Sequence, residues 1–174
     1  MDTAPDDRGT VDGRGSIEGR GSIEGPVAIR PATDADVDTV LALWWAAGAH
    51  PTSTDDAGAI ATLLGRDDGA LLVAEIGGLP VGTLVAAWDG WRGNMYRLAV
   101  LPEVRRRSVA SALVRAGEQR LAARGCGRIT ALVSPEDEGA VEFWVAAGYE
   151  PHPMERYVRT LPPAPGPPLG GPRP

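Results

Sequence analysis

Three consecutive arginines stand where an apolar run gives way to a helical pattern. The stretch "LAVLPEVRRRSVASALV" covers residues 98–114, and Arg105, Arg106 and Arg107 precede its second apolar segment. A helix start already carries unpaired N–H groups and partial positive charge. Arginines beside it favour an anionic ligand, because guanidinium groups pair with phosphate or carboxylate oxygens. The alternative is that these arginines only form the solvated start of a helix.

The elements that would position this junction lie in a domain of about residues 26–160. Hydrophobic periodicity and turn residues predict strands at 27–32, 70–76, 80–88, 95–102, 127–135 and 154–161, and helices at 33–48, 54–66, 105–124 and 136–148. In the helix at 105–124, apolar or small residues recur every four positions, at Val109, Leu113, Gly117 and Leu121. This order predicts an α/β fold, with a mixed, partly antiparallel sheet and flanking helices.

The two ends of the chain differ from this domain in composition. Residues 1–25 are polar and repeat "GRGSIEG", so we expect a disordered segment or an engineered linker. Residues 161–174 are rich in proline and glycine, and we expect a flexible tail.

The net charge of −6 argues against a nucleic-acid binder. A single cysteine suits a cytoplasmic protein, and no apolar run is long enough to predict a membrane segment.

Two stretches resemble motifs of the GNAT superfamily of acetyl-CoA-dependent N-acetyltransferases. The first, "LAVLPEVRRRSVASAL", is similar to a strand ending in Val-x-Pro, a basic residue, and x-x-Gly-x-Gly/Ala entering a helix. The second, "EDEGAVEFWVAAGYEP", is similar to Asn-x-x-Ala-x-x-Phe-Tyr-x-x-x-Gly-Phe. The resemblance spans nearly all of residues 27–160. It implies the GNAT fold, acetyl-CoA as co-substrate and no metal.

The resemblance also implies which residues hold the cofactor. Backbone N–H groups from Arg106 to Ser111 would contact the diphosphate of coenzyme A. The full expected set is Leu98, Ala99, Val100, Arg105, Arg106, Arg107, Ser108, Val109, Ala110, Ser111, Asp137, Ala140, Phe143 and Trp144. The chain departs from the family pattern at Ser108 (usually Gly), Asp137 (usually Asn) and Trp144 (often a Tyr that protonates the departing thiolate).

The family reaction is direct attack of an amine on the thioester, with a backbone N–H between Leu98 and Val100 stabilising the oxyanion. The expected catalytic residues are therefore Leu98 and Val100, together with Tyr96 and Glu75. The general base stays open between Glu75, Asp89, Tyr96, His50 and a chain of water molecules. The expected acceptor residues are His50, Trp88, Asp89, Trp91 and Tyr96.

The sequence therefore predicts an N-acetyltransferase that acts on a primary amine of a small molecule through a ternary complex. The alternatives are a protein or peptide N-acetyltransferase, a transferase for longer acyl-CoA, and an acyl-CoA-binding module that has lost catalysis. Aromatic residues before the cofactor motif, with acids nearby, would form a cleft for a cation. Since Trp44 and Trp45 are adjacent on one helix, we expect one buried and one exposed. The resemblance also allows a homodimer.

Overall fold

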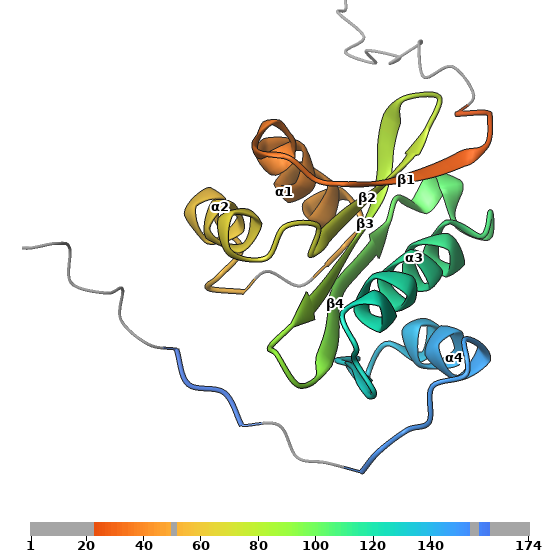
Figure 1. Ribbon diagram of the computed structural model, residues 1–174. Helices are drawn as coiled ribbons and strands as arrows, with labels where there is room; N and C mark the ends of the chain where they lie inside the picture. The colour runs from red at the N-terminus through yellow and green to blue at the C-terminus, as the bar shows by residue number, and fades with distance from the viewer. Residues whose placement is uncertain (1–22, 50–51, 154–156, 161–174) are drawn as a thin grey trace, which may run out of the picture.

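A mixed sheet separates two pairs of helices in the computed structural model, which describes residues 23–49, 52–153 and 157–160 (Figure 1). The elements are β1 (Val27–Pro31), η1 (Asp34–Asp36), α1 (Val37–Ala46), α2 (Ala57–Arg66), β2 (Leu71–Ile76), β3 (Leu79–Trp88), β4 (Gly93–Val100), η2 (Pro102–Val104), α3 (Val109–Ala123), β5 (Ile129–Ala131) and α4 (Glu138–Ala146). Within the described ranges the sheet has five strands in sequence order. The first four are antiparallel, and β4 pairs with β5 in parallel. The predicted fold class is confirmed.

Each face of the sheet buries its own core. One cluster joins α3 and Trp144 of α4 to the sheet, and the other joins α1 and α2 to it. Helix α3 lies very close to β3 and β4, because a Cβ added at Gly117 would come within 2.9 Å of the Leu84 and Met95 side chains. The predicted four-residue repeat of α3 is confirmed, since its members are all buried: Val109, Leu113, Gly117 and Leu121.

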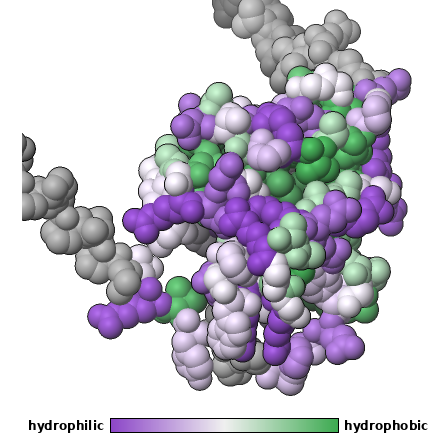
Figure 2. Space-filling model, viewed as in Figure 1, coloured by the Kyte–Doolittle hydropathy of each residue, from purple (hydrophilic) through white to green (hydrophobic). Residues whose placement is uncertain are grey.

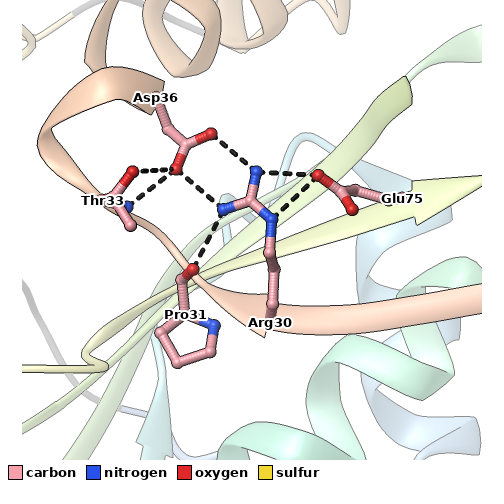
Figure 3. A network of polar contacts seen from close by, with 5 residues as sticks. All are labelled: Arg30, Pro31, Thr33, Asp36 and Glu75. Atoms are coloured by element: carbon pink, nitrogen blue, oxygen red, sulfur yellow. Dashed lines mark hydrogen bonds and ion pairs between the residues drawn. The ribbon is translucent and has the colours of Figure 1, made fainter. Parts of the chain in front are cut away.

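A polar network fixes where the first helical segment begins (Figure 3). The Arg30 guanidinium donates to both oxygens of Asp36, at 2.8 and 2.7 Å, and its Nε donates to Glu75 Oε1 at 2.8 Å. Asp36 also accepts from Thr33 N at 2.7 Å. Arg30, followed by the Thr33 hydrogen bonds, holds the pKa of the Asp36 carboxyl far below its usual range. The network joins β1, β2 and the start of η1.

Most predicted elements differ from the observed ones by one to three residues at an end, and three differ more. The helix expected from residue 105 begins at Val109, because Arg106 and Ser108 adopt φ of 64° and 61°, which an α-helix cannot contain. The strand expected at 127–135 contains only Ile129–Ala131, because β5 leaves β4 there. Of the strand expected at 154–161, only 157–160 are described, and these residues are exposed and pair with no strand of the described chain.

The predictions for the two ends fall mostly on residues outside the described ranges. Within the ranges, Ile23 already packs against the α3-side core, so contacts with the domain begin before residue 26. On the face seen in Figure 2, a band of hydrophilic residues crosses the molecule and hydrophobic residues show as separate patches. Among the helices that the structure describes, none has the length and apolarity to cross a membrane.

Candidate active site between two parting strands

Strands β4 and β5 separate after a short parallel pairing. Their last shared hydrogen bond runs from Leu132 N to Met95 O, at 3.2 Å. Beyond it β4 contains a bulge, since the register with β3 shifts between Thr83 and Val85, and Arg97 has φ of 54°. Because Leu101 N donates to Val81 O of β3, strand alternation directs the N–H group of Val100 away from β3 and toward the gap. Leu98 lies in the bulge itself and lines the cleft.

A cleft of about 1490 Å³ passes through this gap and is lined from both faces of the sheet. On one face its walls come from α1, α2 and the segment between them, and on the other from α3 and α4. Figure 1 shows the two helix pairs on opposite sides of the sheet. The predicted cofactor residues that line the cleft are Leu98, Ala99, Val100, Arg105, Arg106, Ser108, Val109, Ala110, Ser111, Asp137, Ala140, Phe143 and Trp144. The structure thus brings together the whole predicted cofactor set except Arg107.

The start of α3 opens into this cleft without a side-chain cap. Its N-cap residue Ser108 makes no capping hydrogen bond, and the first helical bond runs from Ala112 N to Ser108 O at 2.9 Å. The preceding N–H groups, on Val109, Ala110 and Ser111, are therefore left for an acceptor outside the helix. A helix start with exposed N–H groups attracts anions.

The three arginines before α3 have different surroundings. Arg105 Nη2 donates to Ala47 O at 2.9 Å and its Nε to Val100 O at 3.2 Å, so it joins α1 to β4. Arg107 donates to Ile23 O and does not line the cleft. Arg106 lines the cleft, and within the described chain no hydrogen bond or ion pair holds it. Of the three, Arg106 is the one whose charge faces the cleft without another acceptor.

The α4 wall is aromatic and carries its own helix cap. Asp137 Oδ1 accepts from Ala140 N at 2.9 Å. Trp144 is buried and packs edge-to-face on Phe143 and on Tyr149, with ring centroids 5.6 and 4.7 Å apart. Both Phe143 and Trp144 therefore act as packing groups that also line the cleft, and an indole N–H is too weak an acid to protonate a thiolate.

On the opposite face, a set of contacts holds the bulge; the sequence places Asp55 and Trp44 among the groups of an aromatic, acidic cleft, but it does not pair Asp55 with Arg97. Arg97 Nη2 pairs with Asp55 Oδ2 and donates to Thr52 Oγ1 at 3.0 Å. The Arg97 guanidinium lies 5.1 Å from the Trp44 ring centroid. Trp44 Nε1 in turn donates to Thr83 Oγ1 at 2.8 Å. These contacts fasten the segment between α1 and α2 to the bulge of β4.

Tyr96 is the one predicted acceptor residue that the described structure places in the cleft. Burial, and to a smaller extent the charges of Asp89 and Asp67, raises the pKa of its hydroxyl above the usual value. Tyr96 therefore stays protonated at neutral pH, and its hydroxyl can act as a hydrogen-bond donor to a ligand but not as a general base. The prediction for His50 concerns a residue outside the described ranges.

Other predicted residues lie away from the cleft. Glu75 faces β1, where Arg30 binds its carboxylate. Trp88 packs with the α3-side core. Asp89 closes the turn between β3 and β4 by accepting from Trp91 N and Arg92 N, and Trp91 is 73% exposed there. The structure therefore does not bring Glu75, Trp88, Asp89 or Trp91 to the reacting groups. As expected for the adjacent tryptophans, Trp44 is buried and Trp45 is exposed.

Solved structures share this fold. An aminoglycoside N-acetyltransferase, AAC(6')-Iy in complex with CoA, aligns with a TM-score of 0.65 at 23% identity, covering 79% of this chain and 96% of that one. Ard1 from Thermoplasma volcanium aligns with a TM-score of 0.63 at 20% identity, covering 70% and 81%. An aminoglycoside acetyltransferase from an uncultured soil metagenomic sample, in complex with trehalose, gives 0.64 at 18% identity, covering 78% and 97%.

Sequence comparison agrees with the shared fold. Acetyltransferase plu1384 of Photorhabdus laumondii subsp. laumondii is 38% identical over 115 residues, which are 66% of this chain and 80% of the relative. The family model described as "Acetyltransferase (GNAT) family" matches residues 37–149, which include the parting strands, the α3 start and Trp144. The chain belongs to the GNAT family of acetyltransferases.

Proposed function

We propose that this chain is an N-acetyltransferase that moves the acetyl group of acetyl-CoA onto a primary amine of a small molecule. The observation that carries the proposal is the uncapped start of α3, which opens with Arg106 into a cleft that crosses the sheet. Such a cleft lets an anionic co-substrate and an amine approach one another from opposite faces.

The co-substrate fits the residues present on the α3 side. The N–H groups of Val109, Ala110 and Ser111 and the Arg106 guanidinium would hold the diphosphate. The apolar wall made by Phe143 and Trp144 would take the less polar pantetheine arm. A solved structure with this fold carries CoA, which supports the same assignment.

The reaction joins the amine nitrogen to the acetyl carbon and breaks the bond between that carbon and sulfur. The N–H of Val100, or that of Leu98 in the bulge, would stabilise the oxyanion, because strand alternation directs the Val100 donor into the gap and both residues line the cleft. The described carboxylates in the lining are Asp55, Asp137 and Glu142. Asp55 pairs with Arg97, Asp137 caps α4, and Glu142 belongs to α4, on the side of the cleft assigned to the co-substrate and not to the amine. We therefore assign proton removal from the amine to water. A thiol with a pKa near ~8.5 leaves without a side-chain acid.

The test is thiol release from acetyl-CoA by the full chain, followed colorimetrically with small amines and with short peptides. Release that depends on a small amine supports the proposal. Release with peptides alone would replace the small molecule by a protein or peptide acceptor. Saturable binding of acetyl-CoA with no release by any amine would favour the binding module instead. A cytoplasmic location and a homodimer remain predictions.

A further inference from the structure

The acceptor side of the cleft, on the α1–α2 face, is walled mainly by apolar groups. Its described walls include Trp44, Ile60, Leu63, Val85, Ala87 and Tyr96. These residues belong to the hydrophobic cluster of that face, and Trp44, Ile60 and Val85 are almost fully buried. A ligand bound here would contact apolar side chains, and not water, along most of its length.

The charged side chains that the structure describes on this side of the cleft are Asp55, Arg97 and Arg105, and Arg105 reaches Ala47 O at the end of α1. Asp55 and Arg97 form an ion pair whose side chains are 14% and 18% exposed. Thr52 and the face of Trp44 hold the guanidinium in place. The Asp55 charge is therefore already matched by a protein group, and the described residues leave no uncompensated negative charge in this part of the cleft.

Uncompensated ammonium groups would be unfavourable in such surroundings. Moving an ammonium from water into an apolar site costs several kcal/mol unless a counter-ion meets it. The amine that reacts escapes this cost, because it must be neutral to attack the thioester and an apolar site favours the neutral form. A second ammonium on the same molecule adds a further cost, because it must either lose its own proton or be desolvated as a cation, and the carboxylate described on this side is paired with Arg97.

We infer that the acceptor is a monoamine with an apolar body, and that the Asp55–Arg97 pair excludes polyamines and aminoglycosides. This inference rests on the proposed function. It separates the chain from the solved aminoglycoside acetyltransferases that share its fold, since aminoglycosides carry several ammonium groups. Asp55 and Arg97 are thereby specificity-determining residues of the acceptor side.

The test compares hexylamine with 1,6-diaminohexane, which have the same chain length and differ by one ammonium group. For the full chain with acetyl-CoA, kcat/KM for hexylamine should exceed that for the diamine at least tenfold, although the diamine has two reactive ends. In Arg97→Gln the freed Asp55 carboxylate can meet the second ammonium, so this ratio should fall at least fivefold. In Asp55→Asn the guanidinium is left without its counter-ion, so the ratio should rise.

Opposite shifts in the two variants distinguish specificity from loss of structure, which would lower both rates and leave the ratio unchanged. Arg92→Gln is the matched control, because Arg92 stacks on Trp91 outside the cleft and its loss should leave the ratio unchanged. Equal or faster acetylation of the diamine by the unaltered chain would overturn the inference and leave the proposed function intact. No acetylation of any amine would overturn both.

Discussion

The N-termini of α3 and α4 line the same cleft, but they differ in charge. Helix α4 begins with Asp137, whose carboxylate caps Ala140 N, and Glu138 follows in its first turn. Helix α3 has no acidic residue in its first turn and no side-chain cap, and Arg106 stands before it. The first N–H groups of α4 are therefore capped by a carboxylate of the same helix, whereas no side chain of the described residues caps those of α3.

Two other helical starts also use an acid. Asp56 accepts from Ala59 N at the start of α2, and Asp36 accepts from Thr33 N at the start of η1, from which α1 continues. Among the described α-helices, α3 is therefore the one that neither begins with a capping acid nor continues from a capped turn, although the short η2 also lacks a side-chain cap. An uncapped helix start loses about 1 kcal/mol of stability, and here that loss coincides with the cofactor motif. The comparison shows that the α3 start lacks an acidic cap at the cleft, and the proposed diphosphate site depends on that difference.

The largest effect is expected from an acidic residue placed at the N-terminus of α3. In Ser108→Asp the new carboxylate lies between the N–H groups of α3 and Arg106, and it would repel a diphosphate. We expect KM for acetyl-CoA to rise about 100-fold, which corresponds to about 2.7 kcal/mol. Ser108→Asn is the control, because it has the same shape and no charge, and its KM should change less than threefold. Equal KM values in the two variants would contradict the anion assignment.

An acidic helix start titrates, whereas the α3 start does not. Because Arg30 lowers the pKa of Asp36 in the folded state, the ionised pair adds stability above the unfolded pKa of about 3.9 and loses it as pH falls below that value. We expect Asp36→Asn to lower the free energy of unfolding by about 2 kcal/mol at pH 7. In urea titrations this difference should shrink by about 1 kcal/mol between pH 5 and pH 3. A difference that does not vary with pH would show that the lost contribution is not ionic.

Removing single arginines sharpens the assignment at α3. Arg106→Ala should raise KM for acetyl-CoA about 10-fold with little change in kcat, because a charge-assisted hydrogen bond contributes about 1.5 kcal/mol. Arg107→Ala is the matched variant at the next position, where the side chain donates to Ile23 O outside the cleft. Its KM should stay within about twofold of the original value. Equal increases in both variants would mean that the two arginines attract the anion only through general charge.

The sequence predicted the local features of this cleft well. The four-residue repeat of α3, the strand before it and the acid that begins α4 are patterns within a few neighbouring residues, and the structure contains them. The predicted start of α3 was wrong by four residues. Arginine and serine seldom adopt the left-handed conformation, so the residue types carried no sign that Arg106 and Ser108 would do so. Ser108 stands where the family usually has glycine, so the usual signal is missing.

Contacts between distant segments were the part that the sequence could not supply. Arg105 and Arg107 resemble Arg106 in every local respect, yet they bind the carbonyls of Ala47 and Ile23, which are 58 and 84 residues away. Arg97 and Asp55 are 42 residues apart, and no local pattern joins them. Glu75 was a candidate base in the sequence, but in the sheet β1 pairs with β2 and Arg30 binds the Glu75 carboxylate. Such pairings depend on how the strands are ordered in the sheet.

The left-handed conformation of Ser108 offers a smaller test. A non-glycine residue at φ of 61° costs about 1 kcal/mol, so Ser108→Gly should raise the free energy of unfolding by about 0.5 to 1 kcal/mol. Ser111→Gly is the contrast, because Ser111 lies within α3, where glycine should lower stability by about the same amount. Urea unfolding of both variants is the measurement. A loss of stability in Ser108→Gly would mean that the hydroxyl contributes more than the backbone strain removes.

The smallest effect is expected where α4 is made to resemble the family pattern. In Asp137→Asn the side chain keeps an oxygen that can accept from Ala140 N, so the cap and the fold should persist. The variant removes one negative charge from the cleft wall, and KM for acetyl-CoA should fall by less than about threefold. Since the effect is a charge effect over some distance, it should disappear in 1 M salt, where the Debye length is about 3 Å. A fall in KM that persists at high salt would instead show that residue 137 touches the co-substrate, and the start of α4 would then share the diphosphate-binding role that we assign to the start of α3.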